Sequence, residues 1–284
     1  MLDSSYNGIY QYPQVVQDYW MNEPNFLIEY NEHCTSKEYC AIYFCSNDIW
    51  YPHTEEFFRK RIIEKNFFEW YGCRITRAYK HIFVRDVFKQ WYITGINGKI
   101  NSSSKLLDFL KNETEGYKVI TLGSSAGGYA SALFGPKLGA IQAICFNGQF
   151  CLQRLVNESN NSISPILYSM HKSNSRGVNN ILMGTLNITP IFYIYSDKSK
   201  WDMEQHEFTK GFSQVYCIEF RSSKHGIPFL KVALPKFINL EVSEMEKLVG
   251  KVHRPILFTI KQVGIYKTIS GFIYQIYKAY RKRH

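Results

Sequence analysis

The chain has 284 residues, of which 45% are hydrophobic and 16% aromatic, and this is enough to bury the core of one large domain. We expect neither a secretory signal nor a membrane-spanning segment, because the N-terminal region lacks a basic and apolar leader and no apolar run reaches about 18 residues. The net charge of +10 is concentrated at one end, since residues 251–284 contain eight Lys or Arg and no Asp or Glu. This distribution argues against a basic nucleic-acid groove across the body, and we expect a cytoplasmic protein.

The seven cysteines are odd in number, lack C-x-x-C spacing and lie mostly in apolar runs. This pattern is typical of buried thiols in a reducing compartment, and we expect neither a disulfide framework nor a metal site.

The first half of the chain alternates short apolar runs with helical patterns. We expect strands at 26–30, 40–45 and 81–86, a turn at 46–48, and helices over 55–68 and 105–115, the second preceded by Asn and Ser residues that favour a helix start.

A short motif follows the apolar run at 117–122. The sequence Gly-Ser-Ser-Ala-Gly at 123–127 fits G-x-S-x-G, and a helical pattern begins at once after it. A strand, a sharp turn and a helix form the context of a nucleophile elbow, in which a serine lies on a strained turn and glycines leave room for the neighbouring backbone. Ser125 is therefore the candidate nucleophile. The alternative is a Gly/Ser-rich turn without chemistry.

The second half continues the alternation. We expect strands at 141–146, 190–195 and 214–220 with a helix over 202–212, whereas residues 148–187 are polar, weakly periodic and suggest a cap over the site. The pattern predicts an α/β fold with a mostly parallel central sheet flanked by helices, formed by residues 1–250. Reactive groups gather at the carboxyl ends of the strands in such sheets.

A nucleophilic serine needs a base to take its proton and an acid to orient that base. His225 follows a strand in a turn-rich loop and is the candidate base, and the other seven histidines are assigned structural or solvent-exposed positions. Asp202 is preferred over Asp197 as the acid, although either residue could instead cap the helix that follows.

Two further groups of residues are candidates for the site. The backbone N–H of Ala126 and a second donor near Asn47 are expected to form an oxyanion hole, although no glycine-rich run supports the second donor. Trp50, Trp91 and Trp201 follow predicted strand ends, where they could stack on sugar rings, but core packing is the usual position of such residues.

With these motifs in order, the chain resembles the α/β-hydrolase superfamily over residues 38–240. Residues 43–52 and 85–92 also look like those of bacterial hydrolase-fold proteins of capsule and surface-polysaccharide synthesis, some of which are sugar O-acetyltransferases.

The resemblance implies a triad of Ser125, Asp202 and His225, and an esterase or O-acetyltransferase that acts on a surface polysaccharide through an acyl-serine. It implies a glycan or small acyl-ester substrate, no cofactor for hydrolysis, and acetyl-CoA as the donor for transfer. The alternative is a catalytically inactive binding or scaffold protein in surface-polysaccharide synthesis.

The basic tail, residues 251–284, is expected to form an amphipathic helix. Its apolar residues recur at three- and four-residue steps: Ile265, Tyr266, Ile269, Phe272, Ile273, Ile276, Tyr277 and Tyr280. Such a helix either lies on an anionic membrane, here the inner face of the plasma membrane, or packs against the domain. We expect no nucleic-acid partner.

Overall fold

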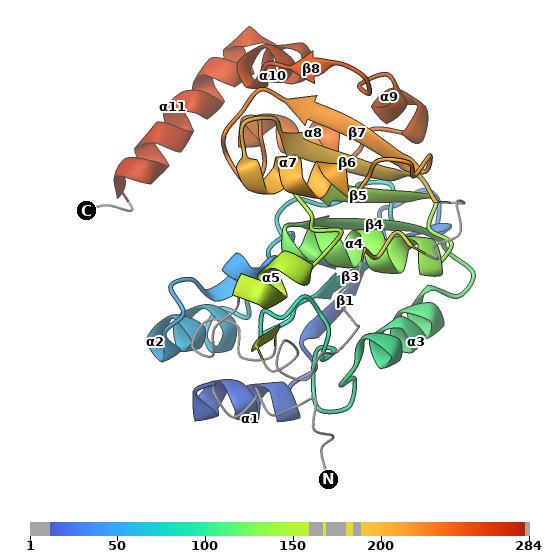
Figure 1. Cartoon of the computed structure of the whole chain (residues 1–284), viewed down its shortest axis with the longest axis vertical. Coiled ribbons are helices and arrows are strands. Elements are labelled where there is room, and N and C mark those ends of the chain that lie inside the picture. Colours follow the sequence, from blue (N-terminus) through green and yellow to red (C-terminus); the bar gives the residue numbers. More distant parts are fainter. Residues whose placement is uncertain (1–11, 159–166, 169–179, 184–188, 282–284) are drawn as a thin grey trace.

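The computed structural model describes residues 12–158, 167–168, 180–183 and 189–281. An eight-stranded sheet crosses it in the order β1-β3-β2-β4-β5-β6-β7-β8 (Figure 1). The edge strand β1 is antiparallel to β3, and every other pair is parallel. The expected mostly parallel α/β sheet is therefore confirmed. The strands are β1 (Phe26–Tyr30), β2 (Tyr39–Phe44), β3 (Lys80–Val84), β4 (Lys118–Ser124), β5 (Gln142–Phe146), β6 (Ile191–Ser196), β7 (Val215–Phe220) and β8 (Val252–His253).

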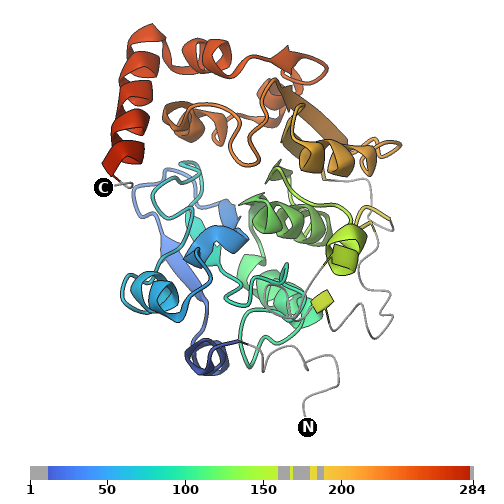
Figure 2. The same cartoon turned by 60° about the vertical axis from the view of Figure 1, so that its left-hand side comes forward.

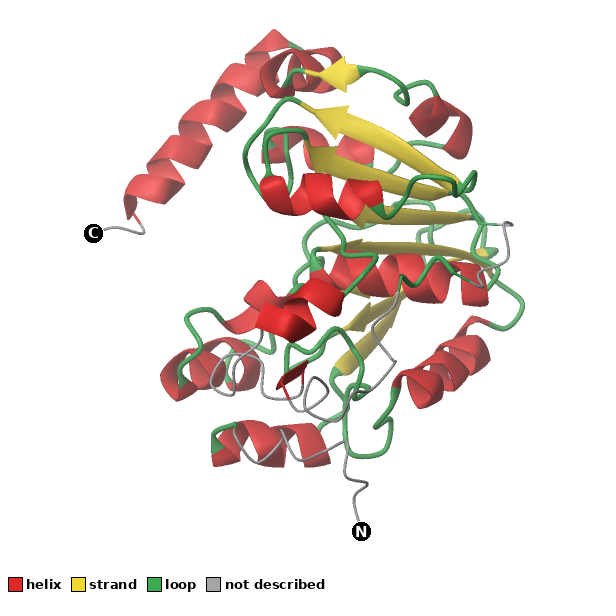
Figure 3. Cartoon of the chain, viewed as in Figure 1, coloured by secondary structure: helices red, strands yellow, loops and turns green. Residues whose placement is uncertain are grey.

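Helices cover both faces of the sheet. In Figures 1 and 3, α4 and α7 lie in front of the strands, and α8 lies behind them. Within the described residues the helices are α1 (Gln14–Asn22), η3 (Asn47–Trp50), α2 (Glu55–Phe58), η4 (Arg59–Ile63), α3 (Ser103–Thr114), α4 (Ala126–Lys137), α5 (Gln153–Glu158), α7 (Lys200–Glu207), η5 (Lys231–Ala233), α8 (Leu234–Phe237), α9 (Val242–Glu246), α10 (Pro255–Val263) and α11 (Ile265–Arg281).

The alternation of side chains along each strand divides the core into two layers. In β2, Ala41 and Tyr43 belong to the buried cluster that includes residues of α8 and α10, whereas Cys40 and Ile42 belong to the cluster that includes residues of α3 and α4. Five of the six β2 residues are buried, as expected for a parallel strand covered on both faces. The sheet is thus a rigid platform whose loops hold the polar residues at its carboxyl edge.

Two predicted helices have different bounds. The helix expected over 55–68 is α2 followed by the π-helical η4, and it ends before Asn66, which has a positive φ of 42°. The helix expected over 202–212 is α7, whose N-cap is Ser199: its hydroxyl accepts the backbone N–H of Asp202 at 3.4 Å. Asp202 therefore lies inside the first helical turn and is not the cap.

Two other predicted segments are the cap at 148–187 and the tail helix at 251–284. Most of the predicted cap at 148–187 lies outside the described residues, and α5 belongs to its described part. Residues 251–284 do not form one helix: β8 pairs with β7, α10 buries Phe258 and Thr259, and Gly264 separates α10 from α11 with a φ of +83°. Within the described part of the chain, no helix is long and apolar enough to cross a bilayer.

Candidate active site

Ser125 lies on a sharp turn between β4 and α4. Its φ of 52° and ψ of −118° are unusual for a residue with a side chain, and its N–H donates to the carbonyl of Phe146 at 2.8 Å. Such backbone strain persists only where the surroundings impose it, and it is concentrated at functional positions. The turn holds the Ser125 hydroxyl at the carboxyl edge of the sheet, in a half-buried position.

The glycines around Ser125 allow this turn to form. A Cβ on Gly123 would lie 2.0 Å from the carbonyl oxygen of Gly127, and a Cβ on Gly127 would lie 2.2 Å from that of Phe44. Both positions are therefore closed to any side chain. The second contact also places the start of α4 directly against the end of β2, so the loop after β2 lies beside the nucleophile.

His225 is brought to Ser125 by the loop between β7 and η5. Its Nε2 lies 3.2 Å from the Ser125 Oγ, and its Nδ1 lies 2.6 Å from Oδ1 of Asp202. The side chain of His225 is 39% exposed, whereas that of Asp202 is fully buried. The loop is fixed to the end of β6, because the Ser196 hydroxyl donates to the carbonyl of Lys224 at 2.7 Å. The structure thus brings together the three residues that the sequence singled out.

The second oxygen of Asp202 has its own donors. Its Oδ2 accepts the backbone N–H of Ser196 at 3.2 Å and the side-chain amide of Asn147. Asn147 follows β5, is fully buried and has a positive φ of 47°. Sequence analysis missed this residue, although an Asn-Gly pair directly after a predicted strand marks a turn where such a φ is tolerated.

The other candidate acid lies elsewhere. Oδ1 of Asp197 accepts the backbone N–H of Ser222 at 3.1 Å, and Oδ2 lies 3.7 Å from the Arg221 guanidinium. Asp197 thus connects the loops that follow β6 and β7. It is Asp202, not Asp197, that contacts His225.

The two candidate oxyanion donors lie at the starts of neighbouring helices. Ala126 is the first residue of α4, and Asn47 is the first residue of η3. The N–H of Ser46 is already committed, since it donates to the carboxylate of Glu69 at 2.6 Å. Burial raises the pKa of Glu69. Among the residues of this turn, Asn47 therefore remains the candidate for the second donor.

The three tryptophans have different environments. Trp50 and Trp91 are buried, and their indole N–H groups donate to the Val87 carbonyl and to the Gln149 side chain. They are core residues, so the expectation that they stack on a sugar is wrong for both, because neither ring has an open face. The half-buried Trp201 packs its ring against His225 at 6.2 Å between centroids. It is therefore the tryptophan of the three that lies beside the site.

A buried amine in the loop after β3 also had no signal in the sequence. Lys89 has a φ of 56°, its Nζ contacts the ring of His53, and it lies 3.3 Å from the centroid of the Trp50 ring. Burial lowers the pKa of Lys89 to about 7. Its carbonyl accepts the side-chain amide of Asn47 at 2.9 Å, which ties the loops after β2 and β3 together. Lys89 lies in the loop that follows β3, where no periodic pattern in the sequence indicates that its side chain is buried.

No protein-family model and no curated protein matches this chain. Among solved structures it is similar to a protein of unknown function from Staphylococcus aureus, with 10% identity, coverage of 78% of this chain and 94% of that one, and a TM-score of 0.49. It is also similar to the capsule O-acetyltransferase of Neisseria meningitidis serogroup A, with 12% identity, coverage of 69% of this chain and 83% of that one, and a TM-score of 0.44. A third similar structure is S-formylglutathione hydrolase from S. aureus, with 14% identity, coverage of 66% of this chain and 78% of that one, and a TM-score of 0.42. Similarities this distant say nothing about reaction or substrate.

Proposed function

We propose that this chain, which has the α/β-hydrolase fold, is a serine-dependent acyl-transfer enzyme. The observation that carries the proposal is the continuous contact from the Ser125 hydroxyl to the His225 ring and on to the Asp202 carboxylate, at 3.2 and 2.6 Å. A hydroxyl, an imidazole and a buried acid in this order form the arrangement that activates a serine at neutral pH.

The proposed chemistry follows from these contacts. The Oγ of Ser125 attacks the carbonyl carbon of an ester or thioester, and its proton passes to Nε2 of His225. Asp202 accepts a hydrogen bond from the Nδ1–H group of His225 and so keeps the ring in the tautomer that can act as base. The backbone N–H groups of Ala126 and Asn47 stabilise the oxyanion. The leaving group then takes the proton from His225, and an acyl-serine remains.

The acceptor decides between hydrolysis and transfer. Water would release the acid, whereas the hydroxyl of a sugar would carry the acyl group away as a new ester. We propose acetyl transfer from acetyl-CoA, as a substrate, to a bacterial surface polysaccharide. This finer proposal is supported by the sequence resemblance of residues 43–52 and 85–92.

Labelling of the serine tests the proposal. Incubation with p-nitrophenyl acetate should release nitrophenol and add an acetyl group to Ser125, detected by peptide mass spectrometry, and the Ser125→Ala variant should do neither. An unmodified Ser125 in folded protein, with butyrate esters also inert, would contradict it. Consumption of acetyl-CoA with and without a de-O-acetylated glycan then separates transfer from hydrolysis, since only transfer depends on the acceptor.

We also propose that α11 brings the enzyme to an anionic membrane. Its apolar stripe is exposed, with Ile269 55%, Ile273 61% and Ile276 55% accessible. An amphipathic helix with an uncovered apolar face binds the interface of a bilayer by burying that face. Replacing these three isoleucines by serine should abolish co-sedimentation with phosphatidylserine vesicles, while a wild-type chain that stays in the supernatant would exclude the contact.

A further inference from the structure

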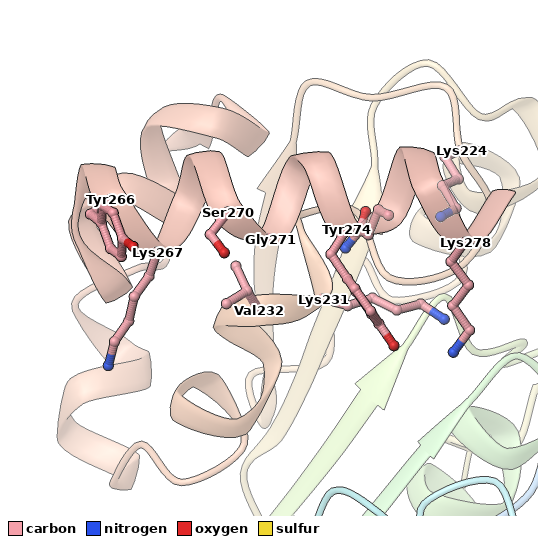
Figure 4. A pocket seen from close by; sticks show the side chains of 10 residues that line it. Lys224, Lys231, Val232, Tyr266, Lys267, Ser270, Gly271, Tyr274 and Lys278 are labelled. Carbon is pink, nitrogen blue, oxygen red and sulfur yellow. The ribbon is translucent and has the colours of Figure 1, made fainter. Parts of the chain in front are cut away.

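A groove runs between α11 and the segment that follows His225. It has a volume of about 780 Å³ and is lined by Lys224, Lys231, Val232, Tyr266, Lys267, Ser270, Gly271, Tyr274, Gln275 and Lys278 (Figure 4). This volume lies within the range of ligand pockets. The groove is separate from the hydroxyl and imidazole of the candidate active site, and it begins at the residue that precedes His225.

The floor of the groove is a close contact between α11 and η5. A Cβ on Gly271 would lie 2.8 Å from Cβ and Cγ1 of Val232, so glycine lets the helix approach the domain at this point. Thr268, one turn earlier, is buried on the same side. Helix α11 thus forms one side of the groove and is packed against the domain near its middle, at Gly271. Figures 1 and 2 show the helix at the margin of the molecule.

The charge of the groove is uniform. Four of its ten lining residues are lysines, and none is Asp or Glu. Figure 4 shows Lys224, Lys231 and Lys278 gathered at one end, and Lys267 at the other. Like charges brought together on a concave surface concentrate a positive potential that attracts anions.

The orientation of α11 separates two kinds of surface. Lys267 and Lys278 line the groove, whereas the exposed isoleucines at 269, 273 and 276 are absent from its lining. These two lysines therefore lie on a different side of the helix from the apolar stripe. Their side chains can therefore contact a ligand in the groove, whereas the isoleucines on the other side of the helix are the residues that would insert into a membrane.

The length of the groove favours an extended ligand. Tyr266 and Lys278 both line it, and twelve residues of α-helix span about 18 Å. Charges at both ends over that distance fit a chain with repeated anionic groups better than a single phosphate. Tyr266 and Tyr274 add aromatic rings, which pack well on the apolar faces of sugars.

We propose that this groove binds an anionic polysaccharide and guides it toward Ser125. The identity of this ligand as acyl acceptor rests on the proposed function, whereas its binding does not. Carboxylate or phosphate groups of the chain pair with the lysines, and Lys224 places the ligand next to the loop of His225. The acceptor is therefore expected to be negatively charged.

Binding of fluorescent polygalacturonate, measured by anisotropy, tests the groove. The double variant Lys267→Glu/Lys278→Glu should weaken binding about tenfold or more, and added salt should weaken wild-type binding. The double variant Lys251→Glu/Lys261→Glu is the matched control, because it changes the net charge equally outside the groove and should bind nearly as well as wild type. Circular dichroism confirms that both variants are folded.

Several outcomes would overturn the assignment. They are equal losses in the two double variants, equal binding of neutral dextran, or tighter groove-dependent binding of coenzyme A or of single-stranded RNA. Hydrolysis of p-nitrophenyl acetate should be unchanged in the groove variant, since neither lysine touches the reacting groups. If the wild type lacks esterase activity but still binds polygalacturonate through the groove, the proposed function fails and the groove stands. If the wild type is active but does not bind polygalacturonate through the groove, the groove fails and the proposed function stands.

Discussion

At the scale of single residues, the carboxylate of Asp202 is the most constrained group of the candidate site. It is fully buried, and its two oxygens contact the ring of His225, the N–H of Ser196 and the amide of Asn147. A buried carboxylate needs such donors, because an unpaired charge in the interior is costly. These contacts hold the carboxyl group of Asp202 with one oxygen against Nδ1 of His225.

We predict that Asp202→Asn lowers kcat for ester hydrolysis by about 10⁴-fold, because an amide no longer selects the tautomer of His225 in which Nε2 is the base. Asp197→Asn is the matched control, since Asp197 contacts Ser222 and Arg221 instead. It should keep most of the activity. Steady-state rates with p-nitrophenyl acetate measure both, and the opposite ranking would assign the acid to Asp197.

Asn147→Gly isolates the side-chain amide behind Asp202. Glycine accepts the φ of 47° at this position without strain, so the backbone is expected to persist while the donor is lost. A hydrogen bond to a charged group contributes about 1.5–3 kcal/mol, and we predict that kcat falls about 10- to 100-fold. Unchanged kinetics in the folded variant would show that Asn147 does not position the acid.

At the scale of elements, the turn from β4 to α4 depends on close backbone contacts. We predict that Gly127→Ala destabilises the protein by about 3 kcal/mol or prevents folding, because its Cβ would lie 2.2 Å from the Phe44 carbonyl oxygen. Gly72→Ala, where nothing lies within 4 Å, should change the free energy of unfolding by less than about 0.5 kcal/mol. Urea denaturation compares the two, and equal effects would refute the steric explanation.

Sequence patterns predicted an element correctly where residues close in sequence determine its structure. The strand at 26–30 has the bounds of β1, and the elbow lies between β4 and α4, where Gly123 meets the nearby backbone of Gly127 as the motif itself predicts. The tail is different. Its apolar periodicity at 265–280 is confirmed by α11, but residues 251–264, which the same prediction includes, form β8 and α10, because the pairing of β8 with β7 and the burial of Phe258 depend on distant parts of the chain. A period in the sequence does not reveal such tertiary contacts.

At the scale of the whole molecule, the parallel sheet assembles the site. Ser125, Asn147, Asp202 and His225 follow β4, β5, β6 and β7, which are consecutive neighbours in the sheet. The order of the elements in the sequence predicted that these carboxyl ends would meet. It could not predict the support of Asp202 by Asn147 or the burial of Trp50 and Trp91, since both depend on which side chains face one another across loops.

The stability of the whole fold should depend on His81 in acid. The Tyr43 hydroxyl accepts the N–H of Ile75 and lies 2.9 Å from Nδ1 of His81, and burial lowers the pKa of this histidine to about 4. As the pH falls from 6.5 toward 4, the unfolded chain takes up a proton that the native ring does not. The free energy of unfolding therefore falls as the pH drops through this window, and above pH 6.5 His81 no longer lowers it.

Asp86 acts in the opposite direction over part of the same window. Burial raises its pKa to about 6, so the native state gains a proton before the unfolded chain does as the pH falls. The pH dependence of the wild type alone therefore mixes the two groups. A variant that removes only His81 is needed to separate them.

We predict that His81→Phe removes the histidine contribution while its ring keeps the stacking between Tyr43 and Phe83. The lost contact with the Tyr43 hydroxyl costs about 1 kcal/mol at neutral pH. Because each pKa unit corresponds to about 1.4 kcal/mol, the stability of the wild type relative to the variant should fall by about 2 kcal/mol between pH 6.5 and 4.5, so that the variant becomes the more stable protein at the lower pH. Urea denaturation at a series of pH values measures this difference, and an advantage that stays constant with pH would mean that the buried ring is protonated as readily in the native state as in the unfolded chain.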